Sequence, residues 1–213
     1  MKLKFEPPVS CLITEGEAAP ENFPEKQQDV LDKVRAATEN RVDLVQIREK
    51  RLSARLLFEL AAAAVEIARN SRTRILVNGR ADIALAAGAA GVHLPANSLS
   101  PRVIRDKFPK DFIIGVSTHS LREAEEAAAQ GADFVFFGPV FDTPGKGAPK
   151  GMEKLEEVCG RLKPFPVIAL GGIDAVNYEK VLAAGVSGIA GIRFLNDPKN
   201  AAIVKDLFGR AHP

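Results

Sequence analysis

The chain alternates short apolar runs with longer segments in which apolar residues recur at helical spacing. The short runs are rich in β-branched residues and predict buried strands, whereas the Ala-, Leu- and Glu-rich segments between them predict helices. The strand-like runs are VSCLIT from Val9, VDLVQIRE from Val42, RILVNGR from Arg74, GVHLP from Gly91, FIIGVST from Phe112, FVFFGPV from Phe134, PVIALGG from Pro166 and GIAGIRFL from Gly188. The clearest helices are expected at Ala54–Asn70, Leu121–Gln130, Met152–Leu162 and Val176–Ala184, with a last one near Asn200–Arg210.

This alternation indicates a repeated βα unit. A helix after each nearly continuous apolar strand predicts a parallel sheet that is covered on its outer face. Residues 127–137 and 181–192 share one order: a helix end, a glycine, a short turn and a buried strand. Eight such units in ~200 residues match the small end of the (β/α)8 barrel range. We therefore expect an α/β protein with one TIM-barrel domain over 1–213. An open doubly wound sheet is the structural alternative, but it would leave the eighth strand unexplained.

Composition narrows the class of protein. A length of 213 residues with 46% hydrophobic content suits one large core, and 29 basic against 27 acidic residues indicate no nucleic-acid or membrane partner. Cys11 and Cys159 lie far apart in apolar surroundings, without metal-ligand spacing, which predicts buried thiols in a reducing compartment. The N-terminus has no apolar signal region, and no uncharged apolar stretch reaches the ~20 residues of a membrane span. We therefore expect a cytoplasmic protein.

A phosphate site is predicted between residues 166 and 195, where a strand ends in Gly171-Gly172 and a second strand returns. Glycine has no Cβ, so a ligand can approach the backbone closely, and amide groups at a following helix start would favour an anion. The structural alternative is that the pair only permits a tight turn. We assign phosphate binding to Gly171, Gly172, Ile192 and Arg193.

Polar residues follow the predicted strands at their carboxyl ends, which meet on one rim of a barrel. Arg48 and Lys50 are two residues apart and should face the same side. Several cations on one rim of a nearly neutral protein favour an anionic substrate. The residues assigned to substrate binding are Arg48, Lys50, Asn78, Arg80, Ser117, Thr143 and Lys146.

Six segments in register resemble the thiamine phosphate synthase and TenI superfamily of small TIM barrels. They are VQIREK (45–50), VNGRADIAL (77–85), GVHLP (91–95), IIGVSTHS (113–120), GADFVFFGPVFDTPGK (131–146) and IALGGID (168–174). The resemblance runs from about residue 12 to about residue 195. It implies a role in thiamine biosynthesis with a small phosphorylated thiazole as ligand, and it allows a homodimer.

Departures from the synthase pattern bear on the activity. Synthases join the thiazole phosphate to a pyrimidine diphosphate with Mg²⁺, and their third strand ends Asn-Asp-Arg, with a second aspartate after strand four. This chain has Asn78-Gly79-Arg80 and Ser98, so both expected carboxylates are missing. Thr143-Pro144-Gly145-Lys146 also lacks one hydroxyl, and Arg193 replaces a serine of the family. We therefore predict no metal and no cofactor, with Asp142 as the remaining candidate carboxylate for Mg²⁺.

The TenI branch catalyses thiazole tautomerisation, a metal-independent proton transfer, and it uses a histidine in the strand-five segment. His119 matches that position, and an imidazole with a pKa near 6.5 can both accept and donate a proton. His93 ranks lower, because a hydrogen-bonded rim histidine explains it equally well. The sequence thus favours a TenI-like thiazole tautomerase with His119 as the catalytic proton shuttle. The alternatives are a thiamine phosphate synthase with a rebuilt Mg²⁺ site and a non-catalytic regulatory protein that binds a thiazole or thiamine phosphate.

Overall fold

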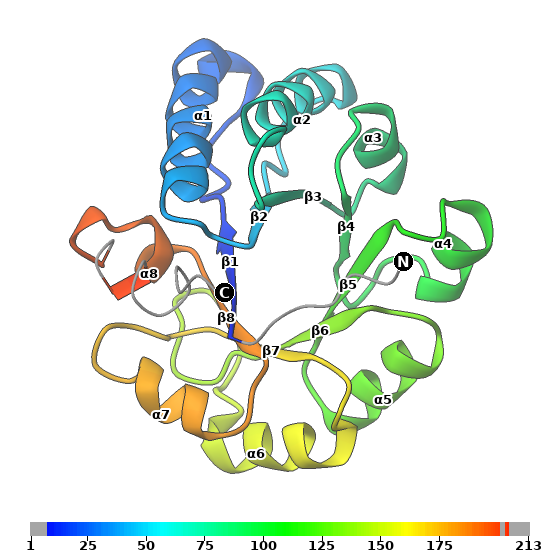
Figure 1. Cartoon of the computed structure of the whole chain (residues 1–213), viewed down its shortest axis with the longest axis vertical. Coiled ribbons are helices and arrows are strands. Elements are labelled where there is room, and N and C mark those ends of the chain that lie inside the picture. Colours follow the sequence, from blue (N-terminus) through cyan, green and yellow to red (C-terminus); the bar gives the residue numbers. More distant parts are fainter. Residues whose placement is uncertain (1–7, 201–202, 205–213) are drawn as a thin grey trace.

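A computed structural model describes residues 8–200 and 203–204 and shows a closed barrel of parallel strands surrounded by helices (Figure 1). The strands are β1 (Val9–Ile13), β2 (Leu44–Ile47), β3 (Arg74–Asn78), β4 (Gly91–Leu94), β5 (Ile113–Thr118), β6 (Phe134–Phe137), β7 (Val167–Leu170) and β8 (Gly188–Gly191). Each strand pairs with the next, and β1 pairs with β8, with Cys11 opposite Ala190. The closure confirms the predicted TIM barrel and excludes the open sheet.

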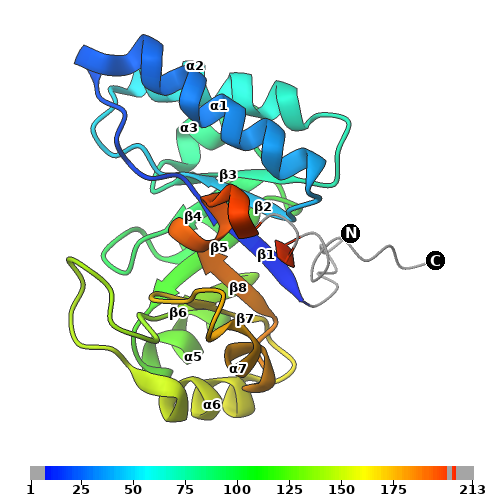
Figure 2. The same cartoon turned by 90° about the vertical axis from the view of Figure 1, so that its left-hand side faces the viewer.

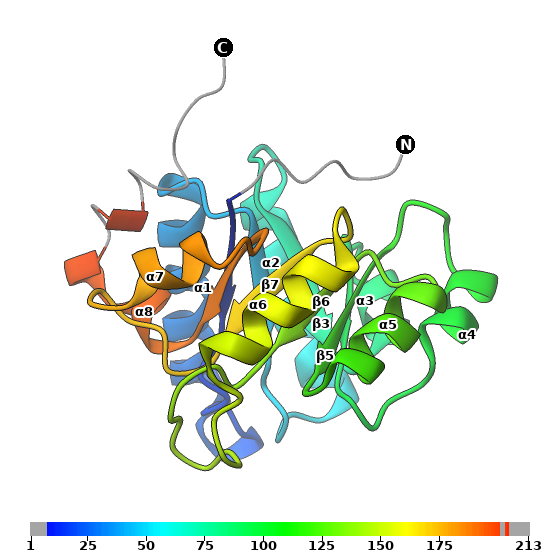
Figure 3. The same cartoon turned by 90° about the horizontal axis from the view of Figure 1, so that it is seen from below.

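The helices form an outer ring. They are α1 (Phe23–Glu39), α2 (Ala54–Ala68), α3 (Ala81–Ala86), α4 (Pro101–Lys107), α5 (Leu121–Ala129), α6 (Gly151–Leu162), α7 (Tyr178–Ala183) and α8 (Arg193–Asn196), with short 3₁₀ turns at Pro20–Asn22 and Pro198–Asn200. Figure 2 shows α1 and α2 side by side on one flank and α5 to α7 on the other. Figure 3 shows α5 and α6 covering β5 and β6. None of the helices in the described ranges has the length and apolar content that a bilayer crossing requires.

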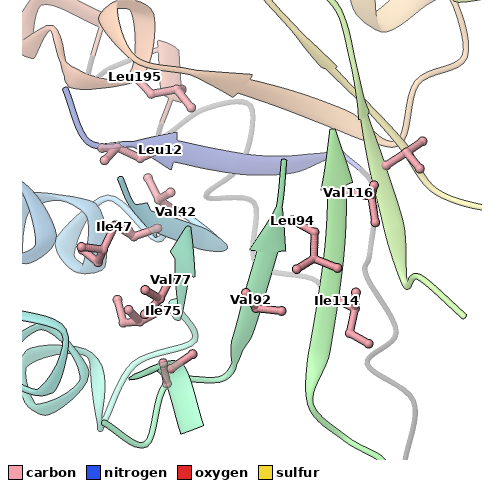
Figure 4. Packing of buried hydrophobic residues seen from close by; sticks show 14 of the residues in the cluster. Leu12, Val42, Ile47, Ile75, Val77, Val92, Leu94, Ile114, Val116 and Leu195 are labelled. Carbon is pink, nitrogen blue, oxygen red and sulfur yellow. The ribbon is translucent and has the colours of Figure 1, made fainter. Parts of the chain in front are cut away.

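The core has two layers because alternate residues of each strand point to opposite faces. In β1, Cys11 and Ile13 pack inside the barrel, whereas Leu12 packs against the helices. The interior cluster consists of Val9, Cys11, Ile13, Leu44, Leu76, Ile113, Phe134, Phe136, Ile168 and Ala190. Figure 4 shows the outer layer, where Ile47 and Val77 face the helices; Ile114 belongs to the same cluster. Both cysteines are buried free thiols, as predicted, and burial raises the pKa of Cys159 to about 11.

Some predicted boundaries were wrong. The run from Gly188 was predicted as one strand to Leu195, but the strand ends at Gly191, the last residue paired with β1, and α8 follows at Arg193. The long α1 was not among the clearest predicted helices because most of its surface is polar, with buried apolar residues only at helical spacing. The helix predicted near Asn200–Arg210 lies almost entirely outside the described residues.

Candidate active site

The carboxyl ends of the strands open into a cavity of about 630 Å³. This cavity lies at the rim of the barrel where the sequence predicts the substrate-binding and catalytic residues. Eleven of the residues assigned from sequence line it: Arg48, Lys50, Asn78, Ser117, His119, Thr143, Lys146, Gly171, Gly172, Ile192 and Arg193. Barrel closure therefore brings together side chains from segments that are distant in the sequence.

Arg80 is the assigned residue that does not line this cavity. Its guanidinium pairs with the carboxylate of Asp82, with Nε–Oδ1 at 2.8 Å and Nη2–Oδ2 at 2.5 Å. β3 ends at Asn78, and Gly79 follows it with φ +70. Arg80 is therefore the residue immediately before α3, which begins at Ala81. The ion pair lowers the pKa of Asp82 and raises the pKa of Arg80. Local pairing at the helix start therefore holds Arg80 away from the site to which the sequence assigned it.

Arg48, Lys50 and Lys146 form a cationic cluster on the cavity wall. None of the three makes a salt bridge with a carboxylate in the described part of the chain. The positive charge of Arg48 lowers the pKa of Lys50, with smaller contributions from partial burial and from Lys146. Like charges held together without a partner would be stabilised by a bound anion.

Neutral polar groups form the floor of the cavity. The amide nitrogen Nε2 of Gln46 lies 2.9 Å from His93 Nδ1, and His93 Nε2 lies 3.1 Å from Ser117 Oγ. Because the amide of Gln46 donates, Nδ1 accepts, and we assign the ring proton to Nε2, which donates to Ser117. Burial, with a smaller effect of Arg48, lowers the pKa of His93 to about 3, so the ring is neutral at pH 7. The ring also stacks on Phe136, with centroids 4.7 Å apart.

Gln46 also carries a buried oxygen without a partner. Its side chain is 1% exposed and lines the cavity, and its Oε1 atom accepts no hydrogen bond from the described residues. A buried unsatisfied carbonyl is costly, so this atom suits a donor on a bound ligand. Gln46 was not among the residues assigned to the site from sequence. Its spacing could have identified it, because Gln46, Arg48 and Lys50 are each two residues apart and should face the same side of the strand end.

His119 is an exposed histidine at the end of β5. Its Nδ1 atom lies 2.5 Å from the carbonyl oxygen of Gly138, which can only accept, so Nδ1 carries a proton. In the neutral ring Nε2 is then the basic nitrogen.

The hydroxyl of Ser120 caps α5 by accepting the Glu123 N–H at 3.2 Å, so Ser117 is not the cap of this helix.

The Gly171-Gly172 turn has a structural cause of its own. The φ angles are +100 and +66, and a Cβ on Gly171 would lie 2.6 Å from Pro139 Cα. The predicted helix start does not follow directly, because Asp174 accepts the Val176 and Asn177 N–H groups in a turn and α7 begins at Tyr178. The turn therefore contributes half-buried backbone to the cavity but no adjoining helix terminus.

The carboxylates near the cavity offer a poor donor set for a divalent ion. Within the described ranges, no group of three or more His, Cys, Asp or Glu residues could hold a metal. Asp142, Asp174 and Asp197 line the cavity, but Asp174 caps its own turn and Asp197 accepts the Lys199 N–H at 2.9 Å. Asp142 alone is left, so these residues do not fit a Mg²⁺ ion held by a carboxylate pair.

The fold and the rim define a (β/α)8-barrel enzyme with a cationic mouth suited to a small anionic substrate. A family profile described as thiamine monophosphate synthase matches residues 11–195. A putative thiamine-phosphate synthase of Geobacter sulfurreducens is 45% identical over 166 residues, covering 76% of this chain and 78% of the relative. The thiamine-phosphate synthase of Chlorobium phaeobacteroides is 37% identical over 200 residues, covering 91% and 92%.

One solved structure agrees with this family match. A thiamine phosphate pyrophosphorylase from Pyrococcus furiosus superposes with a TM-score of 0.79 at 31% identity, covering 93% of each chain. The chain belongs to the TMP-TENI family, and it is an enzyme of thiamine biosynthesis. The family match does not distinguish the TenI branch, and the names of the relatives favour the synthase alternative over the tautomerase that the sequence favoured.

Proposed function

We propose that the chain is a thiamine-phosphate synthase, which joins a thiazole phosphate to a pyrimidine diphosphate and releases diphosphate. The observation that carries this proposal is that the cavity is lined by two sets of residues whose chemistry suits an anion. One is the cluster of Arg48, Lys50 and Lys146, which makes no salt bridge among the described residues, and the other is Gly171-Gly172 with Arg193. A substrate whose only anionic group is one phosphate would occupy one set, whereas a phosphate and a diphosphate on two substrates would use both.

The floor of the cavity suits an aromatic ring with polar edges. Gln46 Oε1 would accept a hydrogen bond from a ring amino group, and Ser117 and Asn78 border the same space. During coupling, a bond to the thiazole forms while the bond between the pyrimidine side and diphosphate breaks. Arg48, Lys50 and Lys146 would stabilise the negative charge on the departing diphosphate, most strongly where water is excluded.

The family resemblance implies Mg²⁺ for this chemistry, but the carboxylates of this chain do not fit that ion. We therefore assign charge neutralisation to the three cations and route no step through a metal. Asp142 is the residue whose substitution would reveal a metal contact.

A coupling assay tests the proposal. Purified protein, thiazole phosphate and pyrimidine diphosphate, with and without Mg²⁺, should give thiamine phosphate and diphosphate in equal amounts. Lys50→Gln should lower kcat/KM by about tenfold or more, because it removes one charge contact with the leaving group. Arg80→Gln is the matched control, since Arg80 lies outside the cavity. Absence of thiamine phosphate under all these conditions would rule the synthase out.

Thiazole tautomerisation is the second candidate, supported by His119. Its protonated Nδ1 is held by Gly138, which leaves Nε2 as a proton acceptor on the cavity wall. In a tautomerase, His119→Gln should lower isomerisation of a carboxythiazole phosphate by about 10²-fold or more. In a synthase, the same variant should retain most of the coupling rate, so the two assays on one variant distinguish the candidates.

A further inference from the structure

Glu49 is a buried carboxylate that lies in sequence between two cavity-lining cations. Its side chain is 3% exposed and does not line the cavity. It extends instead to the loop after β1, where it accepts three hydrogen bonds. The donors are Thr14 Oγ1 at 2.6 Å, Gly16 N at 3.1 Å and Ala18 N at 2.8 Å. One carboxylate therefore fixes the course of this loop through two backbone groups and one hydroxyl.

The same loop contacts Arg48 directly. The Arg48 backbone N–H donates to Thr14 Oγ1 at 2.8 Å, so this hydroxyl bridges Arg48 and Glu49. Gly16 has φ +83, and a Cβ placed on it would lie 3.1 Å from Arg48 Nη1 and 3.1 Å from the Arg48 carbonyl oxygen. The Gly16 backbone is thus packed against the guanidinium group of Arg48.

The loop is also held from its outer side. Arg51 Nη2 donates to the Glu17 carbonyl at 2.8 Å, and Lys26 pairs with the Glu17 carboxylate at 3.0 Å. These contacts are exposed to solvent and contribute little by comparison with a buried charged acceptor. Glu49 is therefore the buried side chain that joins this loop to the end of β2, in addition to the Thr14 N–H, which donates to the Gln46 carbonyl oxygen at 3.0 Å.

We infer that Glu49 is a positioning residue: it holds the loop 14–18 against Arg48 and so keeps the guanidinium directed at an anion in the cavity. Its effect on ligand affinity passes through Arg48, because Glu49 itself lines no part of the cavity. The inference rests on the proposed anion-binding role of Arg48. It does not depend on whether the reaction is coupling or tautomerisation.

A double-mutant cycle with inorganic pyrophosphate as the probe tests this inference. Calorimetry on the wild type, Glu49→Gln, Arg48→Ala and the double variant gives four dissociation constants. An amide at position 49 keeps the shape but places N–H donors against backbone N–H groups, so Glu49→Gln should weaken pyrophosphate binding by about tenfold. The double variant should bind like Arg48→Ala alone, within about twofold, because the effect of Glu49 requires the guanidinium. Equal losses from Glu49→Gln in both backgrounds would overturn the inference, as would no loss in either.

A matched pair at Thr14 covers the case in which Glu49→Gln does not fold. Thr14→Val removes the bridging hydroxyl while keeping the shape, and Thr14→Ser retains it. Thr14→Val should weaken pyrophosphate binding while Thr14→Ser keeps affinity close to the wild type, and identical affinities for the two would contradict the inference. Failure of thiamine phosphate synthesis in the coupling assay would overturn the proposed function but would leave the outcome of this binding cycle unchanged.

Discussion

The neutral His93 at the cavity floor predicts a specific pH dependence of stability. Its pKa is lowered from 6.5 to about 3 in the folded protein, chiefly by burial. Below about pH 6.5 the unfolded chain takes up a proton on this residue and the folded chain does not, so stability is lost as the pH falls towards 3. The slope for one proton is about 1.4 kcal/mol per pH unit. The full shift corresponds to roughly 5 kcal/mol, and about half of this is lost between about pH 6 and pH 4.

Urea unfolding of the wild type and His93→Gln at several pH values measures this contribution. Acid titration of carboxylates acts on both proteins, so the difference in slope isolates His93. The free energy of unfolding of His93→Gln should fall less steeply, by about 2–3 kcal/mol over the interval from about pH 6 to pH 4. Parallel curves for the wild type and His93→Gln would refute the reasoning, as would an NMR titration of His93 near pH 6.5.

Three further predictions concern particular positions. Arg41 has φ +58 after α1, where glycine is favoured, so Arg41→Gly should raise the free energy of unfolding by about 1 kcal/mol in urea titrations, and a decrease would contradict this. A Cβ on Gly188 would lie 2.0 Å from Val9 O, so Gly188→Ala should cost at least about 3 kcal/mol or prevent folding, whereas Gly160→Ala, in an open helical position of α6, should stabilise by about 0.5–1 kcal/mol in the same assay. Arg80→Ala should leave the calorimetric affinity for pyrophosphate within about twofold of the wild type, because the guanidinium is paired outside the cavity, and a tenfold loss would return Arg80 to the site.

The fold could be predicted from sequence because its signals are local. Apolar runs followed by helical periodicity define each βα unit within a few residues, and eight units have one common closed arrangement. The location of the site followed from the same argument, since the carboxyl ends of parallel strands must share one rim. Arg48, Lys50, Lys146 and Ser117 were therefore assigned correctly to the cavity wall, although their roles in binding stay predictions.

The sequence by itself therefore determined the barrel fold, the location of the site at the carboxyl ends of the strands, and the positive charge of that rim. The tertiary structure decided which side chains meet, because partners such as Gln46 and His93 are 47 residues apart and come into contact only when β2 and β4 both pair with β3. It removed Arg80 from the site by a local ion pair, and it buried His93 so that the ring stays neutral. It also gave Glu49 its contacts with a loop 31 to 35 residues away. For Gln46, His93 and Glu49, charge state and orientation depend on burial and on long-range neighbours, which the spacing of residues along the chain does not encode.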